Sequence, residues 1–229
     1  SEGFIVDDLP KKDKIYTDLK WFETNFEGVM PLEIMVDTKK KNGLLRSTAA
    51  INKIDELSTY ISDKSDAARP LSFVEGLKFA KQAYYDGDSA SYAVPYEGDM
   101  AFLGPYLRTK PANDSGSEKK QSPANLLNGF LDSNRQVARI SVNMKDIGSV
   151  QLPLLLKEFE KKANEIFDTA SYNITFTGTS VTFLEGSSFI IAGLKDSIIY
   201  AFALITLCML YLFKSFRILV CSLIPNLVP

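Results

Sequence analysis

The stretch Asp196-Ser-Ile-Ile-Tyr-Ala-Phe-Ala-Leu-Ile-Thr-Leu-Cys-Met-Leu-Tyr-Leu-Phe213 decides how the chain is organised. From Ser197 to Phe213 no side chain is charged, and about 17 residues is near the lower limit for a helix that crosses hydrocarbon. Leu194 or Phe216 lengthens the run at either end. The alternative is a buried core helix, but such runs are usually shorter and this one has no polar face. The sequence therefore predicts a transmembrane helix at 196–213.

The residues after this helix predict its orientation. Lys214 and Arg217 form a short basic turn at 214–217, and basic turns stay in the cytoplasm. These two residues are the topology determinants, and residues 1 to about 190 then lie on the outer side of the membrane. The following apolar run, 218–229, is too short to cross a bilayer, so we interpret it as the start of a next membrane helix and the chain as a fragment of a longer protein.

Composition limits the chemistry of the outer part. The 229 residues are 45% hydrophobic and 24% charged, with a net charge of -2, which gives no electrostatic basis for nucleic-acid binding. Both cysteines, Cys208 and Cys221, lie in the apolar tail, and histidine is absent. The usual general base, the commonest metal ligand and any disulfide framework are thus missing from the outer part. We expect no catalytic site, no metal and no cofactor.

Strict alternation of apolar and polar residues predicts strands. One face of 31–37 carries Leu32, Ile34 and Val36, and the segments 137–143 and 172–177 alternate in the same way. A further short strand is expected near 68–73. Each alternating strand has one wet face.

Longer periods predict amphipathic helices between these strands. A stripe of Ile51, Ile54, Leu57 and Ile61 predicts a helix at 47–63, capped by Ser47. A second stripe predicts a helix at 150–168, with Pro153 near its first turn; its members are Leu155, Phe159, Ala163 and Ile166. Ahead of the first strand, Pro10 to Phe26 reads as a further helix, with Ile15, Leu19, Phe22 and Phe26 on one side and Gly28 as its stop.

In chain order these elements make two strand-helix-strand units. Interleaved with right-handed crossovers, they give an α+β, ferredoxin-like fold: a four-stranded antiparallel sheet with two helices on one face, followed by the C-terminal transmembrane helix. The expected organisation is an entry segment and helix at 1–30, an α+β domain at 31–180, a connecting helix at 181–195 and the membrane segments. The domain contains an insertion at about 75–130, which begins with a helix at 75–85 and includes a polar, mobile loop at about 110–123.

Several motifs together resemble the resistance-nodulation-division (RND) superfamily of transporters, and its MMPL-like hydrophobe-exporter branch in particular. The most specific is Leu212-Phe-Lys-Ser-Phe-Arg217 followed by Ser222-Leu-Ile-Pro-Asn-Leu-Val-Pro229. The others are Val6-Asp-Asp-Leu-Pro10, Asn25-Phe-Glu-Gly28 leading into Pro31-Leu-Glu-Ile-Met-Val36, and Phe176-Thr-Gly-Thr-Ser180. Their order is that of the family, and the resemblance covers nearly the whole chain.

The resemblance implies a piece of a larger inner-membrane transporter of bacteria. The outer domain is expected to be a periplasmic porter domain, that of the second half of the transporter, which handles hydrophobic or amphipathic cargo, lipids included, by opening and closing clefts. Energy is expected from ions, usually protons, through carboxylates on membrane helices outside this chain. The implied partners are the lipid bilayer, the cargo, the remainder of the same transporter and possible further copies of it.

The candidate functional residues each have a plainer structural interpretation. Pro225, Asn226 and Pro229 are the main candidates, as a moving hinge or as a structural kink with helix packing. The charged residues Glu185, Lys195 and Asp196 suit a solvated interfacial cluster better than a coupling relay. Thr206 and Cys208 suit helix packing better than a transport pathway. Tyr84, Tyr85, Tyr92, Tyr96, Phe102 and Tyr106 either line an amphiphile cleft or pack locally.

Three function classes therefore remain open. The favoured one is an exporter of hydrophobic or amphipathic molecules. The second is RND-related machinery that assists protein export, and the third is a membrane-tethered extracytoplasmic binding or sensor module. An enzyme ranks last, and the adjacent carboxylates Asp7 and Asp8 do not change this, because neighbours in an extended chain point to opposite faces.

Overall fold

A computed structural model describes residues 10–26, 28–46, 48–100 and 129–214. The chain divides into two compact units, Ser1–Thr182 and Phe183–Pro229. We call the first the α/β unit and the second the tail unit. The α/β unit is a mixed α+β structure built on a small sheet, and the tail unit contains most of a long apolar helix.

The sheet has three antiparallel strands in the order β2-β1-β3. Strand β1 (Met30–Asp37) lies in the centre, between β2 (Val137–Met144) and β3 (Asn173–Thr177). Ile34 of β1 is paired with Ile140 on one side and with Phe176 on the other. The three alternating strands predicted from the sequence are thereby confirmed, each to within one residue at either end.

The strand expected near 68–73 is reduced to two isolated bridges on the outer edge of β2. Ala67 pairs with Met144 and Leu71 with Ser141, both antiparallel. The backbone N–H groups of Leu71 and Ser141 each donate to the other's carbonyl at 2.8 Å. Pro70 stands just before Leu71 and has no N–H to give to a ladder, which explains why the pairing does not extend.

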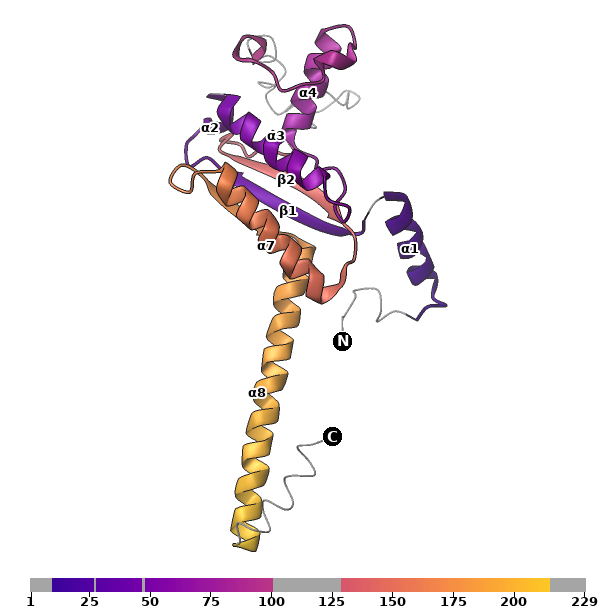
Figure 1. The fold of residues 1–229 in the computed structure, drawn as a ribbon, viewed down its shortest axis with the longest axis vertical. Helices are drawn as coiled ribbons and strands as arrows, with labels where there is room; N and C mark the ends of the chain where they lie inside the picture. The colour runs from indigo at the N-terminus through magenta and orange to yellow at the C-terminus, as the bar shows by residue number, and fades with distance from the viewer. Residues whose placement is uncertain (1–9, 27, 47, 101–128, 215–229) are drawn as a thin grey trace, which may run out of the picture. The chain divides into compact units, whose positions relative to one another are not determined.

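Helices α3 (Thr48–Ser62) and α7 (Gly148–Ile166) cover one face of the sheet (Figure 1). The core lies between them and the strands. It contains Ile51, Ile54, Leu57 and Ile61 of α3, Leu32, Ile34 and Val36 of β1, and Ala138, Ile140 and Val142 of β2, all with 0% exposure. The predicted α3 stripe is confirmed in full, while its predicted cap, Ser47, lies outside the described residues.

Helix α7 differs from its prediction in two respects, its start and the first member of its buried stripe. The helix begins at Gly148 rather than 150, so Pro153 falls in its second turn. Leu152 and Leu156 are buried in the stripe with Phe159, Ala163 and Ile166, whereas Leu155 is only half-buried beside it. The sequence pattern was ambiguous here because four leucines stand within the five residues 152–156, and only the start of the helix sets which of them face the sheet.

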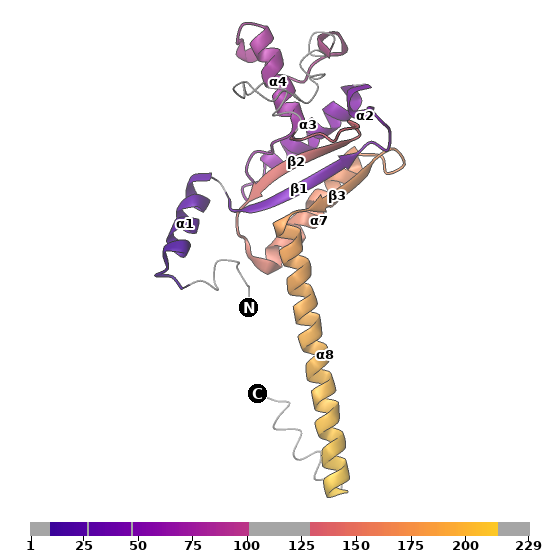
Figure 2. The same ribbon diagram turned by 180° about the vertical axis from the view of Figure 1, so that it is seen from behind.

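The opposite face of the sheet is polar. Figure 2 shows the three strands from this side, in front of α3 and α7. Glu33 of β1 accepts a hydrogen bond from Oγ of Ser141 at 2.9 Å, and its other carboxylate oxygen lies 3.5 Å from Nε of Arg139. On this face the residues of β1 are half-buried, those of β2 are half-buried or exposed, and Asn173, Thr175 and Thr177 of β3 are exposed, so the predicted wet face is confirmed for β3 and in part for β1 and β2.

A glycine fixes how the chain leaves the sheet. Gly178 follows β3 with φ +105, and a Cβ there would lie 2.8 Å from the carbonyl oxygen of Pro31. Two residues later, the hydroxyl of Ser180 donates to that same carbonyl at 3.0 Å. Only glycine tolerates both this backbone angle and this closeness, so the Phe176–Ser180 segment has a structural role.

The remaining elements of the α/β unit are short. Helix α1 (Lys14–Phe26) precedes β1, and α2 (Gly43–Arg46) leads into α3. Helix α4 (Phe73–Tyr84) follows the bridged segment and is followed by the 3-10 helix η1 (Ser89–Ser91). Residues 101–128, which include the predicted loop at 110–123, lie outside the described residues.

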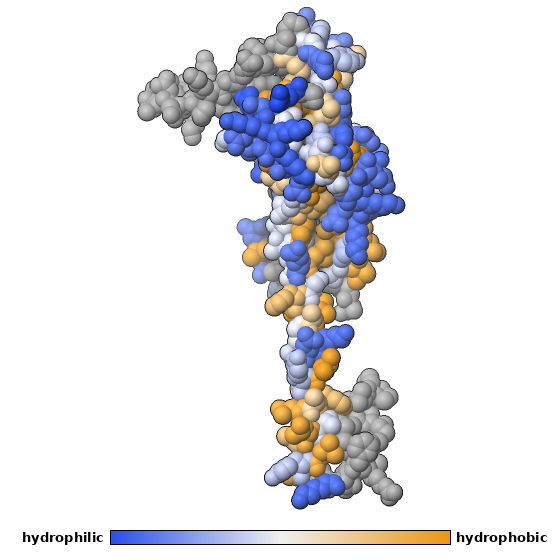
Figure 3. Space-filling model, turned by 90° about the vertical axis from the view of Figure 1, so that its left-hand side faces the viewer, coloured by the Kyte–Doolittle hydropathy of each residue, from blue (hydrophilic) through white to orange (hydrophobic). Residues whose placement is uncertain are grey.

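One helix, α8 (Thr179–Phe213), runs through both the predicted connecting segment and the predicted membrane segment. Its 35 residues span about 52 Å at the usual rise per residue. It is long and apolar enough to cross a membrane over Thr179–Leu212, and none of its most apolar window is buried. Figure 3 shows hydrophobic residues gathered around the lower stretch of this helix. The structure is therefore compatible with the predicted transmembrane helix.

Candidate functional site

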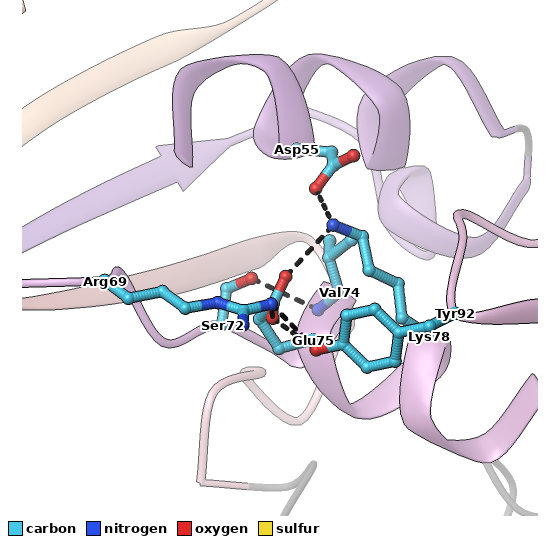
Figure 4. Close-up of polar contacts among 7 residues, drawn as sticks. All are labelled: Asp55, Arg69, Ser72, Val74, Glu75, Lys78 and Tyr92. Atoms are coloured by element: carbon cyan, nitrogen blue, oxygen red, sulfur yellow. Dashed lines mark hydrogen bonds and ion pairs between the residues drawn. The ribbon is translucent and has the colours of Figure 1, made fainter. Parts of the chain in front are cut away.

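A network of charged side chains joins α3 to α4 (Figure 4). Ser72 begins α4, and its hydroxyl accepts a hydrogen bond from the N–H of Val74 at 3.2 Å. One turn on, Nζ of Lys78 lies 3.1 Å from the carboxylate of Glu75 and also pairs with Asp55 of α3. The Lys78 side chain is only 12% exposed, so its two carboxylate partners replace the water that burial removes.

Glu75 holds the second half of this network. Its carboxylate accepts a hydrogen bond from the hydroxyl of Tyr92 at 2.6 Å and pairs with Arg69, which itself donates to the Tyr92 oxygen at 2.9 Å. Burial alone raises the pKa of this carboxyl. The hydrogen bonds from Tyr92 and Lys78 and the charges of Lys78 and Arg69 outweigh that effect and bring the pKa below its ordinary value of 4.5.

A polar recess of about 220 Å³ lies beside the network. Its walls carry carboxylates, cations and hydroxyls from α3, from the bridged segment and from the start of α4: Asp55, Ser58, Thr59, Ser62, Asp63, Arg69, Pro70, Glu75 and Lys78. The Ser58 hydroxyl oxygen is buried and has no hydrogen-bond partner among the described residues. Lys78 and Arg69 are already paired with carboxylates, so this network primarily fixes α4 against α3 and the bridged segment.

A second buried pair holds the segment after η1 against α4. Nζ of Lys81 lies 2.9 Å from the carboxylate of Asp99, with side chains 8% and 11% exposed. Asp99 also accepts hydrogen bonds from the N–H of Tyr96 at 3.0 Å and from the hydroxyl of Tyr85 at 3.2 Å. The hydrogen bond from Lys81 is the main reason that the Asp99 pKa lies below its ordinary value. The segment around Asp99, in the first part of the predicted insertion, is therefore held against α4 by an ion pair and hydrogen bonds.

Four of the aromatic residues considered as lining for a cleft make contacts within this part of the α/β unit. Tyr92 bonds to Glu75, Tyr85 bonds to Asp99, and the ring of Tyr96 lies 4.3 Å from Nζ of Lys81. Tyr84 makes an edge contact with Tyr85, with ring centres 5.3 Å apart. These four rings take part in local packing, while Phe102 and Tyr106 lie outside the described residues.

The polar candidates of α8 lie beyond Ser180, in the part of the helix where no described residue is buried. Glu185, Lys195 and Asp196 are exposed. The Thr206 hydroxyl donates to the Phe202 carbonyl at 2.8 Å, which satisfies it within its own helix, and Cys208 is exposed. The structure does not bring these residues together into one site.

Of the residues proposed as topology determinants and hinge candidates, the structure describes Lys214 alone. Its N–H donates to the Leu210 carbonyl at 3.0 Å, and its φ of 47 ends α8. Arg217, Pro225, Asn226 and Pro229 lie outside the described residues, as do Asp7 and Asp8. Within 10–26, 28–46, 48–100 and 129–214, no group of three or more His, Cys, Asp or Glu residues is placed to hold a metal ion.

Sequence reasoning missed the network around Lys78. The spacing of Glu75 and Lys78 at i, i+3 is a visible signal of an ion pair on one helix face. Nothing in the sequence signals that Asp55 and Arg69 meet this pair, because both approach through tertiary contacts. When the chain is compared with protein-family models and with curated proteins, neither comparison gives a match.

Proposed function

We propose that this chain is part of an ion-driven membrane exporter of the RND superfamily, with the α/β unit as an extracytoplasmic, ferredoxin-like porter domain and α8 as the membrane helix that follows it. The observation that carries the proposal is the succession of two strand-helix-strand segments and a long apolar helix. The cargo is a hydrophobic or amphipathic molecule or a lipid, and the energy comes from an ion gradient, most simply of protons.

The pairing order supports the ferredoxin-like assignment. The bridged segment 67–71 lies on the free edge of β2, β1 lies between β2 and β3, and all neighbours are antiparallel. Numbered along the chain, the order is second, third, first, fourth, which is that of two interleaved strand-helix-strand units. Both crossover helices, α3 and α7, lie on the same face of the sheet.

The long helix supports a membrane location. Ile198, Leu204 and Leu207 of α8 are each more than half exposed, and water is a poor solvent for so many adjacent apolar side chains. Lys214, directly after the helix, is the first residue of the basic turn that favours the cytoplasmic side. The α/β unit is then on the outer side, where porter domains work.

Site-directed labelling tests the sidedness. In a chain with both native cysteines replaced by alanine, one cysteine is placed at Glu160, exposed on α7, and another, in a separate variant, at Lys214. A membrane-impermeant maleimide should label the Glu160→Cys variant in intact spheroplasts and the Lys214→Cys variant only after lysis. The reverse pattern contradicts the proposed orientation and with it the porter assignment.

A transport assay on the whole protein tests the activity. Deleting the gene that encodes this sequence should slow the energised efflux of an amphipathic fluorescent dye, and the intact gene should restore it unless a protonophore is present. If dye efflux is unchanged but periplasmic proteins accumulate in the cytoplasm, the protein-export alternative is correct. If neither process changes, the tethered-module alternative is favoured.

A further inference from the structure

Helix α1 presents apolar side chains that no described part of the chain covers. None of its 13 residues is buried. Three members of the predicted stripe, Ile15, Phe22 and Phe26, are 58%, 45% and 50% exposed, while the fourth, Leu19, is half-buried. Trp21 beside them is 61% exposed. The rings of Phe22 and Phe26 stack at 4.2 Å, and Trp21 meets Phe26 edge-on at 6.1 Å. A cluster of three aromatic rings thus faces solvent at the C-terminal end of α1.

Lysines gather at the other end of this segment. Lys11, Lys12 and Lys14 are all exposed and are accompanied there by Asp13, which is occupied in capping the helix through the N–H of Ile15 at 2.9 Å. The fourth lysine, Lys20, is paired with Glu23 at 2.8 Å. Asp18, also exposed, adds a second carboxylate, so residues 10–18 carry three lysines and two aspartates and keep a net charge of +1 next to an apolar stripe.

This combination suits a lipid surface better than a protein surface. Aromatic rings favour the boundary between hydrocarbon and head groups, and lysines favour anionic head groups while their stems lie along apolar surface. A second copy of the chain is a weaker occupant. A whole aromatic residue buries about 150–250 Å², so four half-exposed side chains offer on the order of 400 Å² of surface per copy. This area is about half of what each partner buries in a standard interface.

We propose that α1 is an interfacial helix, which lies in the surface of the membrane that α8 crosses and contacts anionic phospholipid head groups through Lys11, Lys12 and Lys14. The inference rests on the membrane anchorage in the proposed function. Because α8 ties the α/β unit covalently to the bilayer, α1 needs only a weak intrinsic affinity to stay on its surface. The α/β unit then has two attachments to the membrane, one at each end of its described sequence.

Trp21 provides a direct test because it is the only tryptophan of the chain. The full chain, with Cys221 replaced by serine, is reconstituted in vesicles of phosphatidylcholine and phosphatidylglycerol. Bromine atoms are placed on the lipid chains either near the head group or near the chain end. We expect loss of most Trp21 fluorescence with shallow bromines and a smaller loss with deep bromines. Equal fluorescence in brominated and plain lipid overturns the inference, and so does emission that changes only with the protein-to-lipid ratio, which indicates a second copy.

Two variants and their controls separate the roles of charge and rings. The triple change Lys11→Glu, Lys12→Glu and Lys14→Glu should reduce the quenching in vesicles that contain phosphatidylglycerol, whereas the control Lys40→Glu, Lys41→Glu and Lys157→Glu should not. The double change Phe22→Ser and Phe26→Ser should reduce the quenching of Trp21 in vesicles with and without phosphatidylglycerol. Phe79→Ser, which changes a ring 66% exposed on α4, should leave the quenching unchanged. Slow amide exchange in β1 shows that each variant is folded. If the quenching of Trp21 is unchanged in both α1 variants, the inference is wrong.

Labelling of Cys208 in the same vesicles distinguishes this inference from the anchorage. If Cys208 is protected from a water-soluble maleimide but Trp21 is not quenched, α8 is inserted and the inference about α1 is wrong. If Cys208 reacts while Trp21 is quenched, α8 is not inserted and the anchorage is wrong; the contact of α1 with lipid is then retained, but not its place beside a membrane that α8 crosses. If Cys208 reacts and Trp21 is not quenched, both are wrong.

Discussion

Helices α3 and α8 are both rich in large aliphatic residues, but they differ in where those residues find cover. The stripe of α3 is fully buried by the sheet and its neighbours, while polar residues such as Asn52 and Thr59 occupy its exposed side. On α8 the aliphatic side chains lie on all sides, and Ile198, Leu204 and Leu207 are 67%, 64% and 65% exposed. A helix with one apolar side is covered within its own chain, whereas a long helix without a polar side is compatible with a membrane span.

The largest effect is expected when charged residues are introduced into α8, because this change tests whether its exposed apolar residues hold the chain in a membrane. Leu204→Lys together with Leu207→Lys places two charges near the middle of the predicted span. Each lysine costs about 2.5–3.5 kcal/mol at the centre of a membrane helix, so the pair costs on the order of 6 kcal/mol. We expect the chain to move almost completely from the alkali-resistant membrane pellet to the soluble or aggregated fraction.

The matched control adds two lysines to the polar side of α3, as Asn52→Lys and Thr59→Lys. These residues are exposed, so the fractionation should not change. If the chain with two lysines in α8 stays in the membrane pellet, then α8 does not hold the chain in the membrane. The difference in exposure between α3 and α8 would then not reflect a difference in solvent.

The second-largest effect concerns the covered side of the comparison. Phe159 of α7 has 0% exposure and packs in the same core as the α3 stripe. Phe159→Ala should lower the free energy of unfolding of the α/β unit by about 3–5 kcal/mol through lost burial and a cavity. The measurement is amide exchange of Ile34 and Val36 in β1, with the chain in vesicles.

Phe79 on α4 supplies the matched control because it is the same residue type and 66% exposed. Phe79→Ala should change the free energy of unfolding by no more than about 0.5 kcal/mol. Similar losses in the two variants would mean that the core does not lie where α3, α7 and the sheet meet.

How far the sequence predicted this structure follows from the same contrast. The alternation in β1 and the stripe of α3 repeat with the period of their own element, so each was visible without knowledge of its partners. The segment near 68–73 was predicted as a short strand, but Pro70 and the Ser72 cap of α4 leave it only two bridges. In general, a local pattern predicts an element but does not predict how far its pairing extends.

The candidate site was the less predictable part. Asp55, Arg69 and Glu75 are separated along the chain, and each alone resembles an ordinary surface charge. Their convergence on Lys78 and Tyr92 depends on the turn from the bridged segment into α4. Such convergence is a tertiary property, and no spacing rule for one element contains it.

A third, smaller effect sharpens the comparison at the level of single glycines. Gly28, just before β1, has φ +145, and a Cβ there would lie 2.4 Å from the carbonyl oxygen of Met144. Gly28→Ala should lower the free energy of unfolding by about 2–4 kcal/mol, from backbone strain and from a contact that the backbone must relieve. Amide exchange in β1 again provides the measurement.

In α8, by contrast, a Cβ added at Gly186 meets no atom within 4 Å. Gly186→Ala should therefore cost the α/β unit nothing and should favour the helix slightly. A loss at Gly186 as large as that at Gly28 would show that α8 is packed against protein as tightly as the strands are.

The smallest effect is pH-dependent and concerns Glu75. A carboxyl whose pKa is lower in the folded protein stabilises the fold at pH values above its ordinary pKa, here 4.5, and this stabilisation is lost as the pH falls from there through the lowered pKa. Glu75→Gln should lower the free energy of unfolding by about 1–2 kcal/mol at neutral pH, because a charged hydrogen-bond acceptor becomes a neutral one. Below pH 4.5 the stability of the wild-type unit should fall more steeply than that of the variant, so that the two curves converge.

Glu160→Gln on the exposed side of α7 is the control and should follow the wild-type curve. Parallel curves for the Glu75→Gln variant and the wild type would mean that the Glu75 carboxylate gains nothing from Lys78 and Tyr92, and that α4 is held to α3 by its apolar contacts alone.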